Sequence, residues 1–431
     1  MLPKFFTKKK ILIYGLGLSG NSCLKFLRKK SFVKIFDDNY LLKNKKNEKI
    51  FLKKKDILNS KFDYIILSPG IDIKKCNLKS YLARNWKKII TELDIFQKCY
   101  PKNIKITITG TNGKSTTCQM LYDILRIKKK DVRLVGNIGK PPLQEKKIKK
   151  NTIFIVEASS YQISYNKFFK TDYAAILNLS VDHLERHENL KKYANAKIKL
   201  ISDQEKNKFS FIEKKSDIIN KLILNKNIKS KIIKINYNNM IFFKKKINNS
   251  YLLDENNLKN IHFVYKISKQ LKISDEKIFK SLNLFKALKF RKEIIYDKFN
   301  LKIINDSKST SFSSTRGLLS SYKNIYWIVG GLSKKGDKFI LEKRYYKNIF
   351  AYVIGLNKFY FINQFKNKIK FKYSKNLKNA IFTIKNDIKK DKKKKTILFS
   401  PAAASFDQFK NFEYRGRYFN KLIKKASLYG K

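Results

Sequence analysis

The chain has 431 residues, a length that predicts two to four domains, and we expect three. Hydrophobic residues make up 43% of the chain, which excludes extended disorder and fibrous repeats. Lys and Arg number 98 against 33 Asp and Glu, a net charge of +65, yet only ten of these basic residues are Arg. Because nucleic-acid sites draw heavily on Arg, we interpret the charge as compositional bias at solvated positions, and nucleic-acid binding stays open as the alternative.

The four cysteines are scattered, with no CxxC pair and no neighbouring histidine. This pattern indicates neither a zinc site nor a disulfide framework and favours a reducing compartment. The longest apolar runs fall short of the roughly 18 residues that a membrane helix needs, so we expect no membrane span.

A strand over residues 11–14, a glycine turn and a helix to about residue 29 open the chain. The turn, Gly15 to Gly20, has the pattern G-x-G-x-x-G, and Asp37 follows the next strand. Backbone amides in such a turn face a diphosphate, and the acid can hold a ribose hydroxyl. The pattern predicts a site for NAD or a nucleotide-sugar, with a plain tight turn as the alternative.

A second turn follows a strand over residues 104–109 and opens another helix, as a phosphate-binding loop does. It comprises Gly110, Thr111, Asn112, Gly113, Lys114, Ser115 and Thr116. We expect its amides and Lys114 to bind the β- and γ-phosphates of ATP, and a Ser115 or Thr116 hydroxyl to bind Mg²⁺. The spacing departs from the general pattern, because Gly110 stands only three residues before Gly113.

Three further clusters follow the ends of predicted strands. Glu157 ends a buried strand, where a Mg²⁺ ligand is expected, although the first turn of a helix would also suit an acid. His183 and His187 are two of the chain's three histidines, which favours a site there. Residues 305–310 place a lysine and hydroxyls after the strand that opens a third unit, with a solvated loop as the alternative.

Alternating strands and helices with short glycine loops predict an α/β protein with parallel sheets. Between these motifs we expect strand-like pieces over 206–250, helices over 256–286, and a solvated helix end and loop over 385–395. The strands expected in the last third of the chain lie near 299–304, 325–329, 350–354 and 396–399.

Taken together, these motifs resemble the Mur ligases, and they follow the family's order along nearly the whole chain. The motifs are Thr109 to Thr116, Glu157 to Gln162, Asn178 to His183, Tyr193 to Lys197, Asn305 to Lys308 and Ser400 to Gly416. The last of these blocks is the most specific. The resemblance has departures: Glu185 stands where the family tends to have Asp, and the usual His-Asn and His-Arg pairs appear as Asn256-Asn257 and Phe290-Arg291.

The resemblance implies three domains and an amide-forming reaction. Residues 1–93 would form a Rossmann-like UDP-sugar domain, 94–297 a central P-loop ATPase domain and 298–431 a Rossmann-like amino-acid domain. ATP would phosphorylate the carboxylate of UDP-MurNAc-L-Ala, and the amine of D-glutamate would then attack the acyl phosphate. We expect a cytoplasmic monomer that makes peptidoglycan precursors and binds no specific nucleic acid.

The resemblance also assigns roles to individual residues. The catalytic set is Lys114, Glu157, His183 and Lys197. Two Mg²⁺ ions would be held by Ser115, Glu157, His183 and Lys197. ATP would also contact Asn257 and Arg291. The UDP-sugar would bind Leu18, Ser19, Asp37, Gly70 and Asn137. D-glutamate would bind Lys308, Thr310, Ser405 and Phe412.

Lys197 lies in the frame Tyr-x-x-Ala-Lys, the family's position for a carbamylated lysine. A second Mg²⁺ needs anionic oxygens, which a lysine carbamate supplies and a free ammonium does not. We therefore expect Lys197 to be carbamylated, although an ordinary solvated lysine is the simpler interpretation.

Three other classes of protein are the alternatives. Folylpolyglutamate synthetases share the central ATPase but begin directly with the phosphate loop, without a G-x-G-x-x-G domain. An NAD oxidoreductase would need an acid/base set that we do not find. A nucleic-acid-binding NTPase predicts ATPase stimulation by DNA or RNA.

Overall fold

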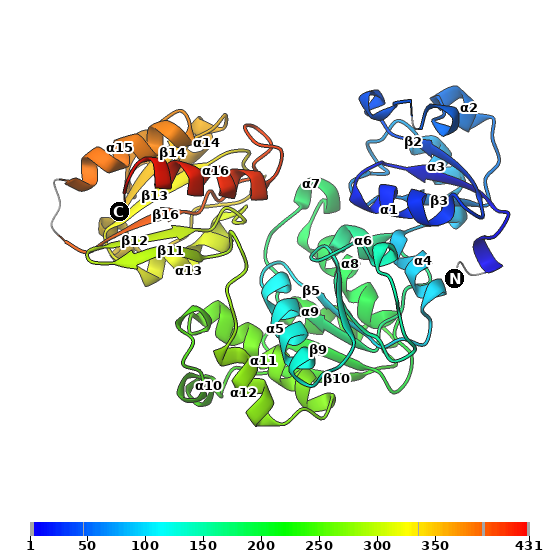
Figure 1. The fold of residues 1–431 in the computed structure, drawn as a ribbon, viewed down its shortest axis with the longest axis horizontal. Coiled ribbons are helices and arrows are strands. Elements are labelled where there is room, and N and C mark those ends of the chain that lie inside the picture. The colour runs from blue at the N-terminus through cyan, green and yellow to red at the C-terminus, as the bar shows by residue number, and fades with distance from the viewer. Residues whose placement is uncertain (1–3, 46, 335, 390–392, 429–431) are drawn as a thin grey trace. The chain divides into compact units, whose positions relative to one another are not determined.

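The computed structural model describes residues 4–45, 47–334, 336–389 and 393–428. Three β-sheets follow one another along the chain (Figure 1). The fold class is therefore α/β with parallel-sheet, Rossmann-like domains at both ends and a central sheet domain, as predicted. The chain divides into two compact units: the first contains residues 1–179, 191–246 and 259–283, and the second contains 180–190, 247–258 and 284–431.

The first sheet has four parallel strands in the order β2-β1-β3-β4. Its elements are β1 (Lys10–Tyr14), α1 (Leu18–Leu27), β2 (Phe32–Phe36), α2 (Lys54–Leu58), β3 (Tyr64–Leu67), α3 (Lys79–Arg84), β4 (Ile89–Ile90) and α4 (Glu92–Cys99). The predicted strands at the start of the chain are confirmed. β1 and β3 carry runs of buried apolar residues, as strands covered on both faces do, whereas the edge strand β2 alternates exposed Phe32 and Lys34 with buried Val33 and Ile35.

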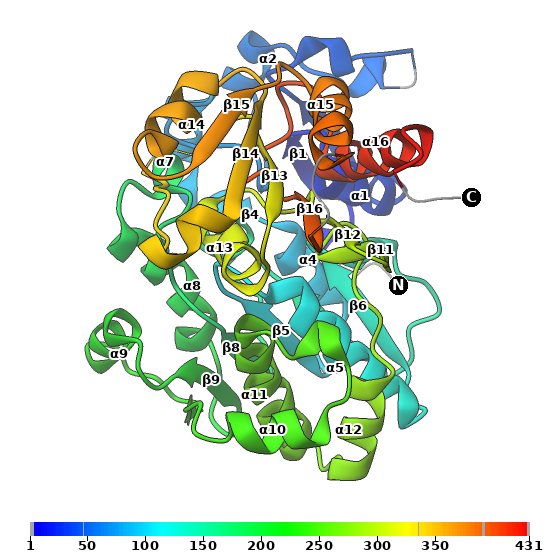
Figure 2. The same ribbon diagram turned by 90° about the vertical axis from the view of Figure 1, so that its left-hand side faces the viewer.

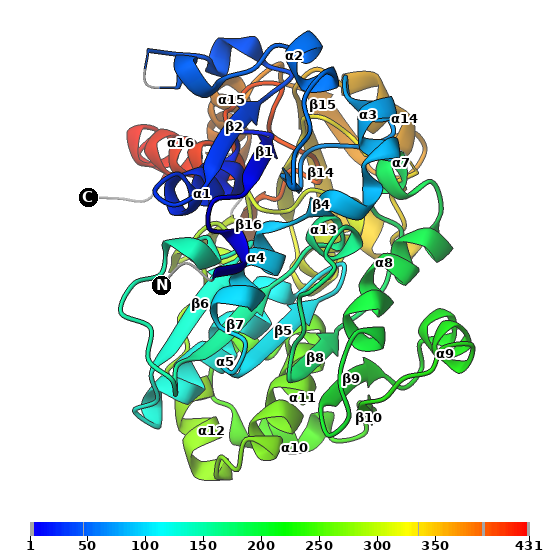
Figure 3. The same cartoon turned by 90° about the vertical axis from the view of Figure 1, so that its right-hand side faces the viewer.

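The central sheet has six parallel strands in the order β10-β9-β8-β5-β7-β6 (Figure 3). Its strands are β5 (Lys105–Thr109), β6 (Val132–Gly136), β7 (Ile153–Glu157), β8 (Tyr173–Ile176), β9 (Phe209–Glu213) and β10 (Lys231–Ile235). The helices of this region are α5 (Lys114–Ile127), α6 (Ser160–Ser164), α7 (Leu184–His187), α8 (Leu190–Ser202), α9 (Asp217–Leu224), α10 (Met240–Lys246), α11 (Glu255–Gln270) and α12 (Asp275–Asn283).

The third sheet has the order β11-β12-β16-β13-β14-β15, and only β11 runs antiparallel to its neighbour. Its strands are β11 (Glu293–Lys298), β12 (Leu301–Asn305), β13 (Ile325–Gly330), β14 (Ile349–Ile354), β15 (Lys370–Tyr373) and β16 (Lys395–Phe399). Its helices are α13 (Phe312–Ser321), α14 (Lys358–Phe365), α15 (Leu377–Lys389) and α16 (Phe412–Lys425).

Successive residues of these strands alternate between two cores, one on each face of the third sheet. Ile304 and Trp327 pack with α13 and α14, whereas Ile303 and Ile328 pack with α15 and α16. Figure 2 shows the two helix pairs on either side of the strands. Because both faces are covered, the carboxyl ends of the strands are where this domain can present a site.

The structure corrects two expectations. Residues 206–250 contain α9 and α10 as well as two strands, so the expectation of strands alone is wrong. The third sheet begins at Glu293, ahead of the predicted domain start at 298, because β11 pairs with β12 through a turn at Phe299. The two edge strands of this sheet, β11 and β15, were not among the expected strands. Neither is buried, β11 carries charged residues at both ends, and β15 alternates with lysine, so both lack the buried apolar run of a central strand.

Short 3₁₀ helices complete the described residues, at Lys4–Phe6, Tyr40–Leu42, Glu48–Ile50, Trp86–Lys88, Pro142–Gln144, Ser250–Leu252 and Lys343–Asn348. We expected a helix end and a loop over residues 385–395. α15 covers this segment as far as Lys389, and residues 390–392 lie outside the described residues. None of the described helices is both long enough and apolar enough to cross a bilayer.

Candidate active site

The phosphate loop lies between β5 at the centre of the second sheet and the N-terminus of α5. Gly113 caps α5 with φ of 83°, a left-handed conformation that favours glycine. The Lys114 side chain folds back over the loop, and its Nζ donates to the carbonyl oxygens of Gly110 at 2.9 Å and Thr111 at 2.8 Å. The ammonium therefore lies on the loop that would surround the phosphates.

Ser115 and Glu157, both predicted as Mg²⁺ ligands, are in direct contact. The Ser115 hydroxyl donates to Glu157 Oε2 at 2.5 Å, and both residues are 1% exposed. The other carboxylate oxygen, Oε1, accepts from Asn137 Nδ2 at 2.9 Å. Asn137, predicted as a UDP-sugar residue, thus orients the carboxylate beside the phosphate loop.

Two asparagines fix the loop itself. Asn178 Oδ1 accepts from the Asn112 amide at 2.9 Å, and Asn178 Nδ2 donates to the Asn112 carbonyl at 3.1 Å. Asn260 faces Gly113 so closely that a Cβ on this glycine would lie 2.3 Å from Asn260 Oδ1. Sequence reasoning missed Asn260, although it belongs to the same asparagine-rich helix start that includes Asn257.

Lys197 is buried on α8 and is 1% exposed. Its Nζ donates to the Gly110 carbonyl at 3.0 Å and to Thr109 Oγ1 at 3.3 Å. It also lies 4.5 Å from the centre of the Tyr193 ring. The solvated-lysine interpretation is wrong, because the amine touches the phosphate loop.

Among the described residues, no group of three or more His, Cys, Asp or Glu side chains could hold a metal ion. A hydroxyl and one carboxylate still suit Mg²⁺, which usually keeps several waters and binds through one or two carboxylates plus substrate phosphates. The pair Ser115 and Glu157 fits that donor set.

His183 belongs to the second compact unit, in the short segment of residues 180–190. It begins α7 with φ of 55°, and its own amide donates to Asp182 Oδ1 at 3.0 Å. Its Nε2 and Nδ1 each lie 3.4 Å from a carboxylate oxygen, of Asp182 and Glu185 respectively. Its role as a metal ligand remains a prediction.

Asn257 and Arg291, both predicted to contact ATP, also belong to the second unit. The amide of Asn257 donates to Asp254 Oδ2 at 2.6 Å and to the Tyr251 carbonyl at 2.8 Å. The hydroxyl of Tyr251 in turn donates to the Arg291 carbonyl at 3.3 Å. These contacts place the two residues on one local network, and their ATP contacts remain predictions.

The first glycine turn is tightly built. Gly15 has φ of 95°, and a Cβ on Gly20 would lie 1.8 Å from the Gly15 carbonyl oxygen, so neither position accepts a side chain. Asp37 accepts from the Leu16 amide at 2.6 Å, which means that it also braces the turn. Leu18 is 82% exposed at the start of α1, open to a ligand.

Two of the residues predicted for D-glutamate meet in the second unit. Lys308 Nζ lies 3.9 Å from the centre of the Phe412 ring. The buried Arg415 joins their loop to the one that ends at Ser405, because it donates to the carbonyls of Ser307 at 2.7 Å and Ala403 at 3.0 Å. Burial lowers the pKa of this guanidinium to about 10, which leaves it charged at neutral pH.

Asp306 lies beneath the same loops. It accepts from the Ser400 hydroxyl at 2.8 Å and the Lys292 amide at 3.1 Å. Burial raises its pKa to about 6, despite these hydrogen bonds and the positive charges of Lys292 and Arg291. Thr310, the remaining D-glutamate candidate, precedes α13 by two residues.

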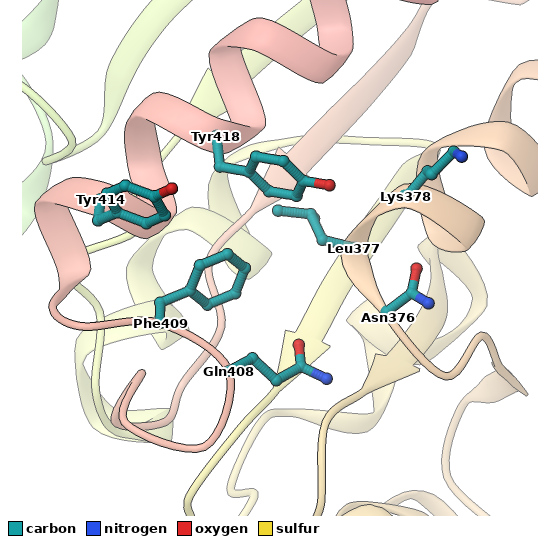
Figure 4. A pocket seen from close by; sticks show the side chains of 7 residues that line it. All are labelled: Asn376, Leu377, Lys378, Gln408, Phe409, Tyr414 and Tyr418. Carbon is teal, nitrogen blue, oxygen red and sulfur yellow. The ribbon is translucent and has the colours of Figure 1, made fainter.

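A pocket opens beside α15 and α16 in the same unit. Figure 4 shows its lining residues, Asn376, Leu377, Lys378, Gln408, Phe409, Tyr414 and Tyr418. None of them was predicted as a site residue. The pocket shares only neighbouring chain with the predicted D-glutamate residues, since Gln408 follows Ser405 and Tyr414 follows Phe412.

A phosphate loop on the central sheet, with a buried carboxylate against its serine, defines the class as a nucleotide-binding α/β protein. The family model described as Mur ligase middle domain matches residues 108–275. Similar curated proteins span the chain. The UDP-N-acetylmuramoylalanine–D-glutamate ligase of Rickettsia prowazekii is 33% identical and covers 97% of this chain and 99% of its own. The ligase of the same name from Buchnera aphidicola is 35% identical, and the match covers 97% of this chain and 98% of its own. The chain belongs to the Mur ligase family.

Solved structures agree on the fold. MurF ligase from Thermotoga maritima in complex with ADP aligns with a TM-score of 0.59, 13% identity and coverage of 98% of this chain and 96% of that one. UDP-N-acetylmuramate-alanine ligase MurC from the same organism aligns with a TM-score of 0.57 and 16% identity, and the alignment covers 97% of this chain and 100% of that one. At such identities the likeness shows the fold alone.

Proposed function

We propose that this enzyme joins D-glutamate to UDP-N-acetylmuramoyl-L-alanine in peptidoglycan precursor synthesis, with ATP as co-substrate. The full-length similarity to ligases of that name carries the proposal. The contact of Ser115 with Glu157 at the phosphate loop supports the use of ATP with Mg²⁺. We infer that the protein acts in the cytoplasm as a monomer.

The reaction must first activate a carboxylate, because an oxide ion is too poor a leaving group for an amine to displace it from a carboxylate. The terminal phosphoryl group of ATP passes to an oxygen of the L-alanine carboxylate, and ADP leaves. The amine of D-glutamate then attacks the carbonyl carbon, loses a proton, and phosphate leaves as the amide forms. Negative charge moves along the phosphoryl oxygens in both steps, so fixed positive charge nearby lowers both barriers.

The chain's own groups supply that charge and the alignment. Lys114 and the amides at the start of α5 face the phosphates. Ser115 and Glu157 would hold Mg²⁺, which neutralises phosphate charge when it is bound, and Asn137 keeps the carboxylate oriented. A second ion at His183 and a carbamate on Lys197 complete the set that we propose.

Three substrate regions complete the assignment. The turn at Gly15 to Gly20, with Leu18, Ser19, Asp37 and Gly70, is proposed to take the UDP diphosphate and ribose. Asn257 and Arg291 are proposed for the nucleoside of ATP. The amino-acid site is proposed at Lys308, Thr310, Ser405 and Phe412.

The test is phosphate release from ATP with UDP-MurNAc-L-Ala and a panel of D- and L-amino acids, with the product identified by mass. We expect release only when both UDP-sugar and D-glutamate are present. Lys114→Met should lower kcat by about 100-fold or more, whereas Lys128→Met at the end of the same helix should retain activity. Release without D-glutamate dependence would contradict the proposal, and stimulation by DNA or RNA would favour the nucleic-acid NTPase.

A further inference from the structure

The pocket beside α15 and α16 lies at the carboxyl edge of the third sheet. α15 follows β15, and the loop of residues 400–411 joins β16 to α16, so both helices begin where parallel strands of this sheet end. Sheets of this kind bind their ligands at that edge. The pocket has a volume of about 400 Å³, which is within the range of small-molecule sites, and all its lining residues belong to the second compact unit.

Three aromatic rings form one wall of the pocket. The centre of the Phe409 ring lies 5.7 Å from that of Tyr418 and 6.4 Å from that of Tyr414, with interplanar angles of 49° and 46°. Figure 4 shows these rings on one side and Leu377, which is 1% exposed, across from them on α15. Because Tyr414 is 54% exposed and the other two rings are half-buried, parts of the ring faces are accessible to a planar ligand.

Two carboxamides stand at the rim, one from each of the two connections. Asn376 Oδ1 caps α15 by accepting from the Asn379 amide at 2.9 Å, which leaves its Nδ2 group as a donor. Among the described residues, the carboxamide of Gln408 and the hydroxyls of Tyr414 and Tyr418 have no hydrogen-bond partner. These groups are therefore available to the edge of a bound ring.

The charge around the pocket is positive. Among the described residues that line it, Lys378 alone carries a charge, and it belongs to no ion pair. Residues 372–379 and 406–421, from which the pocket is built, contain seven Lys or Arg and two Asp or Glu. One of these acids, Asp407, is turned toward the Leu356 amide, which donates to its Oδ2 at 3.2 Å. The pocket therefore favours an anionic ligand over a cationic one.

A flat ring with hydrogen-bonding groups on its edge and a negative charge beside it describes a nucleotide. Bases stack on aromatic side chains, and Asn or Gln pairs with adenine through its amino group and the adjacent ring nitrogen. We propose that this pocket binds an adenine nucleoside monophosphate, with the base against Phe409 and Tyr418, its edge at Asn376 and Gln408, and the phosphate at Lys378. This site is separate from the phosphate loop of the central sheet, and it does not depend on the proposed function.

The first measurement is calorimetric binding of AMP to the full chain, in saturating ATP analogue and UDP-MurNAc-L-Ala, which occupy the other proposed nucleotide sites. We expect one AMP per chain. Adenosine, which lacks the phosphate, and IMP, in which a carbonyl replaces the amino group, should each bind at least about fivefold more weakly. Hydrogen–deuterium exchange in the same mixture should show protection on adding AMP at residues 374–380 and 406–418.

The second measurement compares variants. Tyr414→Ala and Tyr418→Leu should each weaken AMP binding by about 5- to 100-fold, and Lys378→Ala should remove the difference between AMP and adenosine. The fold should be retained, because Tyr414 is exposed and Leu preserves the apolar packing of Tyr418 between α15 and α16. The matched controls are Phe382→Ala, an exposed aromatic residue of α15, and Lys425→Ala at the end of α16, and both should leave binding unchanged.

Three results would overturn the proposal. The first is the absence of AMP binding in this mixture, or protection confined to residues outside 374–380 and 406–418. The second is equal binding of AMP and glucose 1-phosphate, which has the phosphate and a sugar but no base for the aromatic wall. The third is binding of a single-stranded oligoadenylate at the same residues at least tenfold more tightly than AMP, which would identify nucleic acid as the occupant.

Discussion

Arg415 illustrates how a single buried residue shapes the region proposed as the amino-acid site. Its guanidinium is 1% exposed and donates to the backbone carbonyl of Ser307 at 2.7 Å and that of Ala403 at 3.0 Å, and to the Ser307 hydroxyl at 3.2 Å. Two loops that come from distant parts of the chain are thereby held at a fixed separation. Lysine could not replace it, because one ammonium cannot reproduce a planar fork of donors.

Asp306 makes the stability of the C-terminal domain depend on pH. Its folded-state pKa of about 6 is above the ordinary value of 3.8, so the fold favours the protonated acid. The contribution to stability is complete below pH 3.8 and is lost as the pH rises through 6. The difference of 2.2 between these two pKa values corresponds to a contribution of at most about 3 kcal/mol to the free energy of unfolding.

We therefore predict that Asp306→Asn, which keeps a hydrogen-bond acceptor and removes the charge, gains up to about 3 kcal/mol relative to the wild type between pH 4 and pH 7. Urea unfolding followed by Trp327 fluorescence in a Trp86→Phe background checks this, because the Trp327 indole donates to the Ser400 carbonyl beside Asp306. A stability difference that is the same at both pH values would contradict the prediction.

At the scale of elements, α8 brings a lysine to the phosphate loop. We predict that Lys197 is carbamylated in the active enzyme, because its buried Nζ touches the Gly110 carbonyl and burial disfavours a free ammonium. Lys197→Ala should abolish turnover, and acetate should restore part of it. The matched control is Lys199→Ala, which removes a lysine that pairs with Asp203 on the same helix and should leave turnover intact.

A direct readout of the modification is a carbamate carbon signal in the NMR spectrum after incubation with ¹³C-bicarbonate, present in the wild type and absent in Lys197→Ala. Full activity of Lys197→Ala in bicarbonate-free buffer would show that the lysine has no such role.

The central strands could be predicted because parallel strands buried on both faces appear as uninterrupted apolar runs that end at glycine or polar loops. β7 and β13 are of this kind. The edge strands and the helices α9 and α10 could not be predicted in this way. α9 is as rich in Ile and Leu as a strand, and in β15 the other residues alternate with lysine. The sequence pattern of these segments does not distinguish a helix from a strand, and their packing in the folded protein determines which of the two forms.

The site shows the same division. Ser115 and Glu157 were found because each follows a buried strand in a recognisable motif. The contacts of Asn260 with Gly113 and of Lys334 with Asp182 join residues far apart in the chain, the latter pair 152 positions apart. A single sequence carries no signal for such pairs, because a motif identifies a residue but not the distant residue that it contacts in the fold.

At the scale of the whole molecule, substrates assigned to three domains must come within about 3 to 3.5 Å of each other to react. We predict that the C-terminal domain closes over the others when nucleotide and UDP-sugar bind. Residues 297–300 cannot be the hinge, because they turn the hairpin of β11 and β12 within one sheet. We place it in residues 284–292, which contain neither helix nor strand.

X-ray scattering should show a smaller radius of gyration with ATP analogue plus UDP-MurNAc-L-Ala than with no ligand, and an intermediate or unchanged value with the analogue alone. Profiles that are identical in all three states would count against closure.

The ion pair between Asp182 and Lys334 also has a consequence for the order in which the protein is made. At about 5 to 20 residues per second, Lys334 leaves the ribosome roughly 8 to 30 seconds after Asp182. During that interval the nascent chain already has its phosphate loop, but Asp182 lacks its ion-pair partner. A chain released before residue 334 would therefore lack the ion pair that holds residues 180–190 to the loop after β13.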